Sequence, residues 1–555
     1  MSAPNQASGK AIAIGIDFGT TYTGVAYGYG ANEPMPVGTW PLGPQIRPEH
    51  DSPKVPSKIA YFKRSNALTA PSVWGYQAWD EPGAISWFKL FLLEQRDLQS
   101  HLTNSDHLNV ARERVRELGK DVIDIIADYL AQVWKHAVER IQTARSKGFI
   151  LNNRLHIVVT VPAICALHQA GIFDKRPQCD ETTWAFVSEP EATALASIEG
   201  HQKHNTLKPG QTFVIADLGG GTVDLISFQV RATEPQLLID EVVEGNGGLC
   251  GATFLDQAFE KYLEIMTFAW ERGIKRNYYA GAPGQRIDLG SQGNRRPVVS
   301  LEPDELNEVF DSVYLDIAKL IEGQVLAILR KTNEMPKYIF QKVQEQWANT
   351  VEILCEEGDK PWTAVSRGAV LAGLEHVKNQ STVRSHVSRY SYGWTKKEPF
   401  NNRTHEIEDF DEDEITGRQI AKDQMEWIIY RGESIQTQKP HVYEYERYFD
   451  INDVGIFEFS EPIYRSRLSS PPSRLADNWT EAGPASDPAG FELYVTIDMK
   501  TPVRVEQLLK RGSRGNESHV LEYNVQVNVS GASLIIEATS EGKRIGKKTI
   551  VGIDK

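Results

Sequence analysis

The chain has 555 residues, of which 41% are hydrophobic and 24% are charged, and these are ordinary values for globular proteins. This length is enough for two to four domains. The formal net charge of −14 argues against a nucleic-acid partner held by phosphate contacts. The lack of any run of about eighteen apolar residues argues against a membrane-spanning helix.

The ends and the cysteines of the chain bear on its compartment. The N-terminus is polar and lacks the apolar stretch of a secretory signal. The cysteines are scattered without metal-binding spacing, at Cys165, Cys179, Cys250 and Cys355. Both features indicate a reducing compartment, so we expect the protein in the cytosol or the nucleus, without a membrane partner.

A β-hairpin is predicted for residues 11–29, where one apolar run ends at Asp17, turns through Gly19 and two threonines, and continues as a second apolar run. Glycine lets the backbone approach a ligand closely, so the N–H groups and hydroxyls of such a turn can wrap a phosphate. The carboxylate at the strand end can hold Mg²⁺ through water. A single motif of this kind equally suits an ordinary turn.

Helices and strands alternate after the hairpin. Residues 58–62 are predicted as a strand, residues 105–146 carry apolar side chains at helical spacing, and another strand follows at 157–162. The glycine turn then recurs in residues 212–224, about 200 residues after the first, with Asp217, three glycines and Thr222. The alternation predicts an α/β domain, and the matched turns predict a duplicated fold that clamps a nucleotide between two lobes.

These turns closely resemble the phosphate-binding signatures of the seventy-kilodalton heat-shock (DnaK-like) chaperone family, within the actin, sugar-kinase and chaperone ATPase superfamily. Later segments resemble the same family in the same order, at residues 186–196, 245–256, 270–276 and 366–374. The resemblance covers residues 11–377 firmly and the rest loosely. Its Gly-Gly-Leu-Cys-Gly variant at residues 247–251 is typical of a divergent branch rather than of the main folding chaperones.

The resemblance implies a two-lobed actin-like (ribonuclease H-like) α/β ATPase domain at residues 11–377, with ATP or ADP and Mg²⁺ as cofactors. It implies catalytic roles for Asp17, Glu189, Asp217 and Thr222. Asp17 and Asp217 would hold magnesium through water, and Glu189 would orient the attacking water, although an acid there also suits a helix N-terminus. The implied nucleotide contacts are Gly19, Thr20, Thr21, Tyr22, Gly219, Gly220, Gly221, Asp224, Gly247, Gly248, Lys275 and Arg276.

One departure from the family pattern concerns the catalytic lysine. That lysine should lie in residues 73–80, where the chain has none, and Lys89 in the next segment better matches a structural helix. A missing phosphate-directed cation removes electrostatic stabilisation, so we expect slow hydrolysis even where ATP binds.

A second departure follows the helix predicted at residues 314–329. Residues 335–337 run directly into residues 338–343, which resemble the helix that should come after a strand and a Gly-Gly turn touching the adenosine. The strand and turn therefore look deleted near 337–338. Either the coding sequence has lost a short piece or the ATPase is degenerate.

Residues 384–555 have the period-2 apolar alternation of strands, as in residues 491–497 and 521–529, and predict a divergent β-rich domain. No long amphipathic helix follows it, so the helical lid of the usual chaperone is absent. The acid-rich run at 406–414 reads as a solvated loop.

The leading functional hypothesis is an ATP-binding chaperone-like protein of protein folding and stress response. Its nucleotide state would control how tightly the β-rich domain, as a substrate-binding module, binds extended polypeptide clients. Co-chaperones would be further partners. One alternative is a non-hydrolysing nucleotide sensor or scaffold. Another is a small-molecule kinase of the same superfamily, which the added β-rich domain disfavours.

Overall fold

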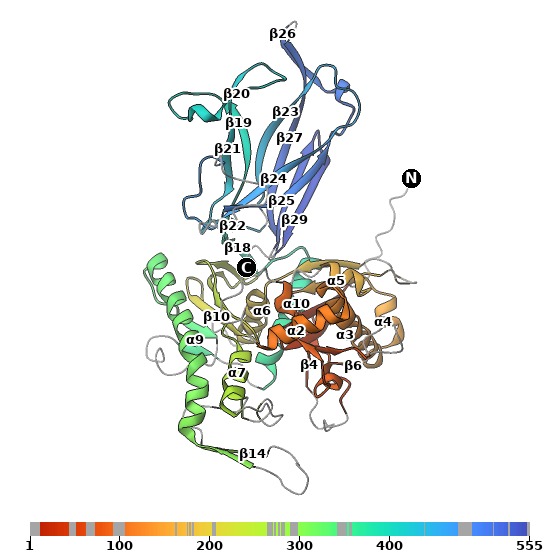
Figure 1. The fold of residues 1–555 in the computed structure, drawn as a ribbon, viewed down its shortest axis with the longest axis vertical. Helices are drawn as coiled ribbons and strands as arrows, with labels where there is room; N and C mark the ends of the chain where they lie inside the picture. Colours follow the sequence, from red (N-terminus) through yellow and green to blue (C-terminus); the bar gives the residue numbers. More distant parts are fainter. Residues whose placement is uncertain are drawn as a thin grey trace. The chain divides into compact units, whose positions relative to one another are not determined.

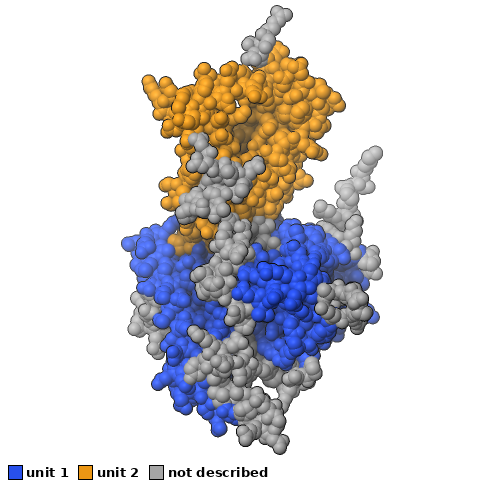
Figure 2. Space-filling view, in the orientation of Figure 1, with its two compact units in different colours: residues 1–228, 245–380 blue, residues 229–244, 381–555 orange. Residues whose placement is uncertain are grey.

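The computed structural model describes residues 11–43, 52–62, 73–92, 106–160, 164–174, 176, 179, 182–202, 207–263, 270, 274–275, 278, 283–288, 298–340, 352–354, 358–437, 439–475, 491–513, 516–530 and 533–551. The chain divides into unit 1, residues 1–228 and 245–380, and unit 2, residues 229–244 and 381–555 (Figure 2). Within the described residues, no helix combines the length and apolar character needed to cross a membrane.

The first sheet of unit 1 is built on the predicted hairpin, which is confirmed. β1 (Ile12–Phe18) pairs antiparallel with β2 (Tyr22–Tyr29) and parallel with β8 (Leu155–Val159). The sheet order is β3-β2-β1-β8-β9, and β4 also pairs with β2. All seven residues of β1 are buried because it lies between two paired neighbours at the centre of the sheet. The other strands are β3 (Met35–Pro36), β4 (Lys54–Pro56) and β9 (Thr182–Phe186).

Helices accompany this sheet (Figure 1). They are α2 (Asp106–Leu118), α3 (Val122–Ala144), α4 (Lys147–Leu151), α5 (Ile164–Gln169), α6 (Glu189–Gln202) and α10 (Lys360–Val377). Helix α10 can lie close to α6 because Gly368 has no side chain, since a Cβ there would be 1.7 Å from the Ala192 carbonyl oxygen. Five smaller elements follow β4 and precede α2 along the chain. They are β5 (Lys58–Ala60), β6 (Val73–Trp74), η2 (Gly75–Ala78), β7 (Ile85–Ser86) and η3 (Phe88–Leu92).

A second sheet in unit 1 contains the second glycine turn. Its strands run in the order β17-β16-β10-β11, with β13 beside β11. Their bounds are β10 (Thr212–Leu218), β11 (Val223–Ala232), β13 (Asn246–Gly248), β16 (Tyr338–Phe340) and β17 (Glu352–Leu354). Strand β11 itself passes from unit 1 into unit 2. This part also contains α7 (Ala252–Leu263), the hairpin of β14 (Gln285–Asp288) and β15 (Val298–Leu301), and the long helix α9 (Pro303–Thr332) (Figure 1).

The prediction of a helix starting at Tyr338 is wrong for its first three residues. Residues 338–340 form strand β16, which pairs parallel with β10 and with β17. An apolar run this short fits a strand or a helix by periodicity, and here its pairing between two strands decides the outcome. Residues 341–343 of the predicted helix lie outside the described residues.

Unit 2 is β-rich, as predicted. Its main sheet has the order β20-β21-β19-β24-β25-β29-β28-β27-β23, with β26 beside β27. The strands are β19 (Ser391–Pro399), β20 (Phe410–Glu412), β21 (Gln419–Ile429), β23 (His441–Asp450), β24 (Glu458–Ser466), β25 (Phe491–Lys500), β26 (Leu509–Ser513), β27 (Asn516–Ser530), β28 (Ser533–Ser540) and β29 (Lys543–Val551). Alternate residues of these strands, such as Val525, Val527, Leu534 and Ile536, form a buried core.

The rest of unit 2 departs from the sequence-based boundaries. Strand β12 (Leu238–Glu241) pairs parallel with β18 (Val383–Val387), which pairs antiparallel with β22 (Ser434–Gln436). Residues 229–244 therefore group with the β-rich unit although they lie between two segments of unit 1. The acid-rich run is also less solvated than predicted, because Asp409 is buried in an ion pair with Arg474.

Candidate functional site

The two glycine turns share one hydrogen-bonded geometry. The N–H of Gly19 donates to the Tyr22 carbonyl at 3.1 Å, and the N–H of Gly219 donates to the Thr222 carbonyl at 2.9 Å. A Cβ on Gly19 would lie 2.4 Å from the Tyr22 carbonyl oxygen, so this turn requires glycine. The repeated sequence motif therefore corresponds to a repeated turn.

The tips of the two turns lie against each other. A Cβ on Gly220 would be 2.1 Å from Thr21 Oγ1, and one on Gly221 would be 2.9 Å from Thr20 Oγ1. The missing side chains of these glycines let the hydroxyls of the first turn approach the backbone of the second. Two segments about 200 residues apart in sequence thus meet at one place in unit 1.

The second turn has its backbone carbonyls on one side and its amides on the other. The carbonyls of residues 219–221 accept hydrogen bonds from the amides of residues 251–253, at 2.8–3.3 Å, where α7 begins. In a trans peptide each N–H points opposite to the preceding carbonyl, so the amides of residues 220–222 point away from α7. Successive amides in a turn can form an anion-binding surface.

Four carboxylates gather at the turns. Asp17 is the next-to-last residue of β1, and Glu189 begins α6. Asp217 and Asp224 lie on β10 and β11 beside the second turn. Burial raises the pKa of Asp217 to about 8, and the other three carboxylates add to the rise. Burial also raises the pKa of Asp17, against the opposing effect of Lys54. Such mutual repulsion means that the site has excess negative charge, which a cation would relieve.

Two lysines enter the same site, and the prediction that it lacks a lysine is wrong. Lys89 Nζ lies 2.5 Å from Glu189 Oε1, and Lys54 Nζ lies 2.6 Å from Asp17 Oδ2. Burial alone would lower the pKa of Lys89, but Glu189 and then Asp17 raise it, and the net shift is upward. Lys89 lies in the short helix η3, as expected of a structural segment, while its side chain reaches the catalytic candidates.

The remaining candidate residues differ in whether they contact the residues of the turns. Gly247 lies beside Asp224 in the β11–β13 pair, and a Cβ on it would be 3.0 Å from Asp224 Oδ1. Gly248 follows on the same strand. Lys275 donates to both carboxylate oxygens of Asp256, at 2.7 and 2.9 Å, so its ammonium is held in an ion pair. Arg276 lies outside the described residues.

Thr222 and Tyr22 complete the two turns. The Thr222 hydroxyl donates to Asp224 Oδ2 at 2.7 Å, which fixes the end of the second turn. The buried ring of Tyr22 packs edge-on against Trp362 of α10, with centroids 5.2 Å apart. Among the described residues, no three acidic, histidine or cysteine side chains form a group that could hold a metal ion directly. Carboxylates that act through metal-bound water do not need such a group.

A signal for Lys89 was present in the sequence. Residues 84–93 contain a single charged side chain, Lys89, among apolar and aromatic neighbours. An isolated charge in such a run must find a partner or a function, because burying it alone is costly. The sequence contains no comparable signal for Lys54. Its partner Asp17 is 37 residues away, and other lysines lie near Lys54 in the sequence, so nothing singles it out.

Comparison with known proteins agrees with a distant relation to the seventy-kilodalton heat-shock family. The heat shock 70 kDa protein 12A of Homo sapiens and that of Mus musculus are each 24% identical to the chain over 391 residues. Each match covers 58% of the chain and 55% of the relative, so the chain spans about half the length of the curated relatives it matches. A family described as a domain of unknown function (DUF8568) matches residues 386–461 of unit 2.

Proposed function

We propose that unit 1 binds ATP with Mg²⁺ at the paired glycine turns and hydrolyses it slowly, as an actin-like ATPase. The observation that carries this proposal is the meeting of both turns with two lysine–carboxylate pairs in one site. The amides of residues 220–222 and the hydroxyls of Thr20 and Thr21 would bind the β- and γ-phosphates. The distant relation to the heat shock 70 kDa protein 12A supports the same activity.

The residues of the site support hydrolysis by positioning and charge neutralisation. Water would attack the γ-phosphorus as the bond from that phosphorus to the bridging oxygen breaks, giving ADP and phosphate. One of the water's protons stays on a phosphate oxygen and the other is released to solvent. Glu189 would orient that water, and Lys89 would hold Glu189 and offset phosphate charge. The carboxylates at the two strand ends, Asp217 foremost, would hold a hydrated Mg²⁺, which would supply further neutralisation of the phosphates.

The adenosine side of the site supports slow turnover. The sequence has no glycine between Gly323 and Gly358, so the expected Gly-Gly turn after β16 cannot form. Strand β16 already occupies the place of the expected strand beside β10, so we expect weak binding of ATP·Mg²⁺, and tighter binding when a Gly-Gly turn is inserted after Phe340. Calorimetry on both chains measures the difference. Equal and tight binding by both would show that the missing segment is irrelevant.

Measuring phosphate release distinguishes an ATPase from the two alternative functions, a nucleotide sensor and a small-molecule kinase. With ATP·Mg²⁺ we expect slow release that Lys89→Met slows further by about 10²-fold. Lys120→Met, which removes the Lys120–Asp128 ion pair elsewhere in unit 1, should leave the release unchanged. Binding without release would favour a nucleotide sensor. Transfer of phosphate to an added sugar would favour a small-molecule kinase.

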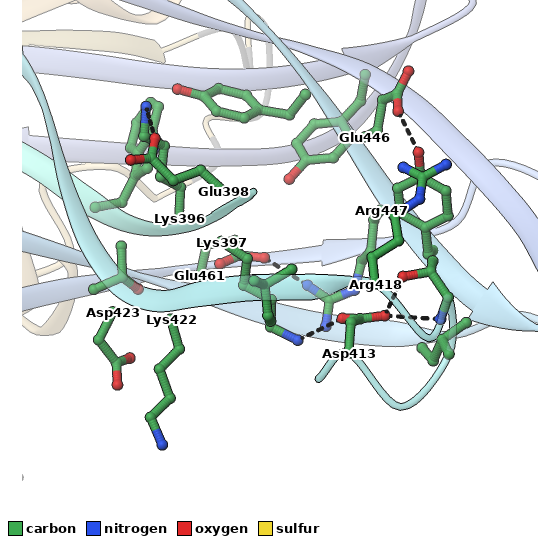
Figure 3. A pocket seen from close by; sticks show the side chains of 18 of the residues that line it. Lys396, Lys397, Glu398, Asp413, Arg418, Lys422, Asp423, Glu446, Arg447 and Glu461 are labelled. Carbon is green, nitrogen blue, oxygen red and sulfur yellow. Dashed lines mark hydrogen bonds and ion pairs between the residues drawn. The ribbon is translucent and has the colours of Figure 1, made fainter. Parts of the chain in front are cut away.

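We further propose that unit 2 holds extended polypeptide clients in a chaperone-like cycle. A cavity of about 530 Å³ in this unit has an apolar floor and a charged rim. The floor includes Trp394, Tyr445, Ile497, Met499, Tyr523 and Val525. In Figure 3, Lys397 points toward Asp413 and Arg447 toward Glu461 along the rim. Cavities of this size commonly bind ligands, and the ten charged side chains that line this one would add polar contacts.

Strand β23 supports an extended client because it ends the strand order among the described residues and contributes to the cavity. A client chain could add its backbone to that edge and place apolar side chains on the floor. Labelled unfolded apolar peptides should bind the full chain with micromolar or weaker affinity and exchange rapidly. Tyr445→Ala should weaken binding, whereas exposed Tyr430→Ala should not. No binding to the folded chain would favour the scaffold alternative.

A further inference from the structure

Asp17, Gly24 and Lys54 form one row across three neighbouring strands. Asp17 of β1 is paired with Gly24 of β2, and Gly24 is paired with Lys54 of β4. Residues in register across a sheet point to the same face. The side chains of Asp17 and Lys54 therefore lie on one face, separated by a residue without a side chain.

Gly24 makes room for the lysine. A Cβ on Gly24 would be 3.3 Å from Cγ and 3.2 Å from Cε of Lys54, so the lysine side chain extends over this glycine to reach Asp17. The ammonium of Lys54 then lies 2.6 Å from Asp17 Oδ2 and 5.1 Å from the centre of the Trp362 ring. The two paired side chains are 12% and 4% exposed. An aromatic face and a buried carboxylate together hold the charge of Lys54 in place.

The two carboxylates expected to hold magnesium therefore differ in their partners. Asp17 has an ammonium in direct contact. Asp217 accepts a hydrogen bond from the Thr193 hydroxyl at 3.4 Å, and no lysine or arginine in the described part of the chain forms an ion pair with it. A hydrated cation is attracted to the carboxylate whose charge is not already compensated.

We propose that Lys54 is a built-in counter-ion of Asp17, and that Mg²⁺ in this chain is held from the side of Asp217 rather than shared by both carboxylates. Lys54 is a positioning residue in this scheme, because it acts through Asp17. This inference deepens the proposed nucleotide site and rests on it. It makes the affinity of the chain for Mg²⁺ lower than two uncompensated carboxylates would make it.

The experiment measures the Mg²⁺ concentration that gives half-maximal binding of a fluorescent ATP analogue. In Lys54→Met, Asp17 becomes available to the metal, so we expect this concentration to fall about tenfold, the change that one added carboxylate–cation interaction of ordinary strength produces. Lys54→Arg should behave like the parent because the charge remains. Lys120→Met, which removes an ion pair with Asp128 and a cation–π contact with Tyr61, is the matched control and should also match the parent.

A second measurement works without nucleotide. Thermal unfolding is followed with MgCl₂ alone, where we expect the unfolding temperature to rise by about 2 °C more in Lys54→Met than in the parent. Failure of every variant to bind the ATP analogue, with this shift present, would overturn the proposed function and keep the counter-ion role. An unchanged magnesium midpoint and no shift in Lys54→Met would overturn the counter-ion proposal.

Discussion

Replacing Gly220 by alanine tests whether the two glycine turns form one site. The added Cβ would lie 2.1 Å from Thr21 Oγ1 and 2.9 Å from Thr21 Cβ. Rotation of the threonine can move its hydroxyl, but its Cβ is fixed to the backbone. To restore an ordinary contact of about 3.4 Å, the turns must separate by about 0.5 Å if the hydroxyl rotates away and by about 1.3 Å if it does not.

Gly220→Ala should lower both the free energy of unfolding and the rate of hydrolysis. Overpacking of this size destabilises proteins by about 1–3 kcal/mol, and a displacement of about 1 Å at a catalytic site can cost on the order of 10²-fold in rate. Urea unfolding and single-turnover hydrolysis measure the two parts. In a double-mutant cycle, Thr21→Ala should recover part of the loss from Gly220→Ala, with a coupling of about 0.5–3 kcal/mol.

The cycle also defines the result that would refute this reasoning. If Gly220→Ala unfolds and turns over like the parent, the turns are not in close contact. If the losses of the two single variants simply add, the clash is not between Gly220 and Thr21.

Three further predictions concern unit 1. Lys89→Met should lower the free energy of unfolding by roughly 3–5 kcal/mol, because Glu189 loses its ammonium partner. The same variant should slow single turnovers by about 10²-fold. Unchanged values would show that the Lys89–Glu189 ion pair contributes to neither. Burial lowers the pKa of His156 to about 4, so as the pH falls this imidazole takes up a proton in the unfolded chain before it does so in the folded chain. The free energy of unfolding should therefore fall by up to about 3 kcal/mol between pH 6.5 and pH 4. Urea unfolding across this range should show a smaller pH slope in His156→Leu, and an equal slope would assign the acid sensitivity elsewhere. Gly323→Ala on α9 meets Asn246 Nδ2 at an ordinary 3.5 Å, so it should stabilise the chain by up to about 1 kcal/mol, whereas destabilisation in the same assay would reveal tighter packing.

The sequence by itself determined the features that depend on neighbouring residues. The hairpin of β1 and β2 follows from two apolar runs and a turn that only Gly19 can close, and all of these lie within eighteen positions, from Ile12 to Tyr29. The strands of unit 2 follow from period-2 alternation, because successive side chains of a strand face opposite sides. Such patterns act locally, so they can be recognised without knowing the fold.

Only the tertiary structure decided which charges meet. Lys54 reaches Asp17 because three strands align in register and Gly24 leaves the path open, and no local pattern encodes that alignment. Lys89 likewise finds Glu189 across 100 positions. Tyr338 belongs to a strand rather than a helix because β10 and β17 lie on either side of it. Each outcome depends on partners distant in sequence, since short apolar runs and single lysines are compatible with several environments until packing selects one.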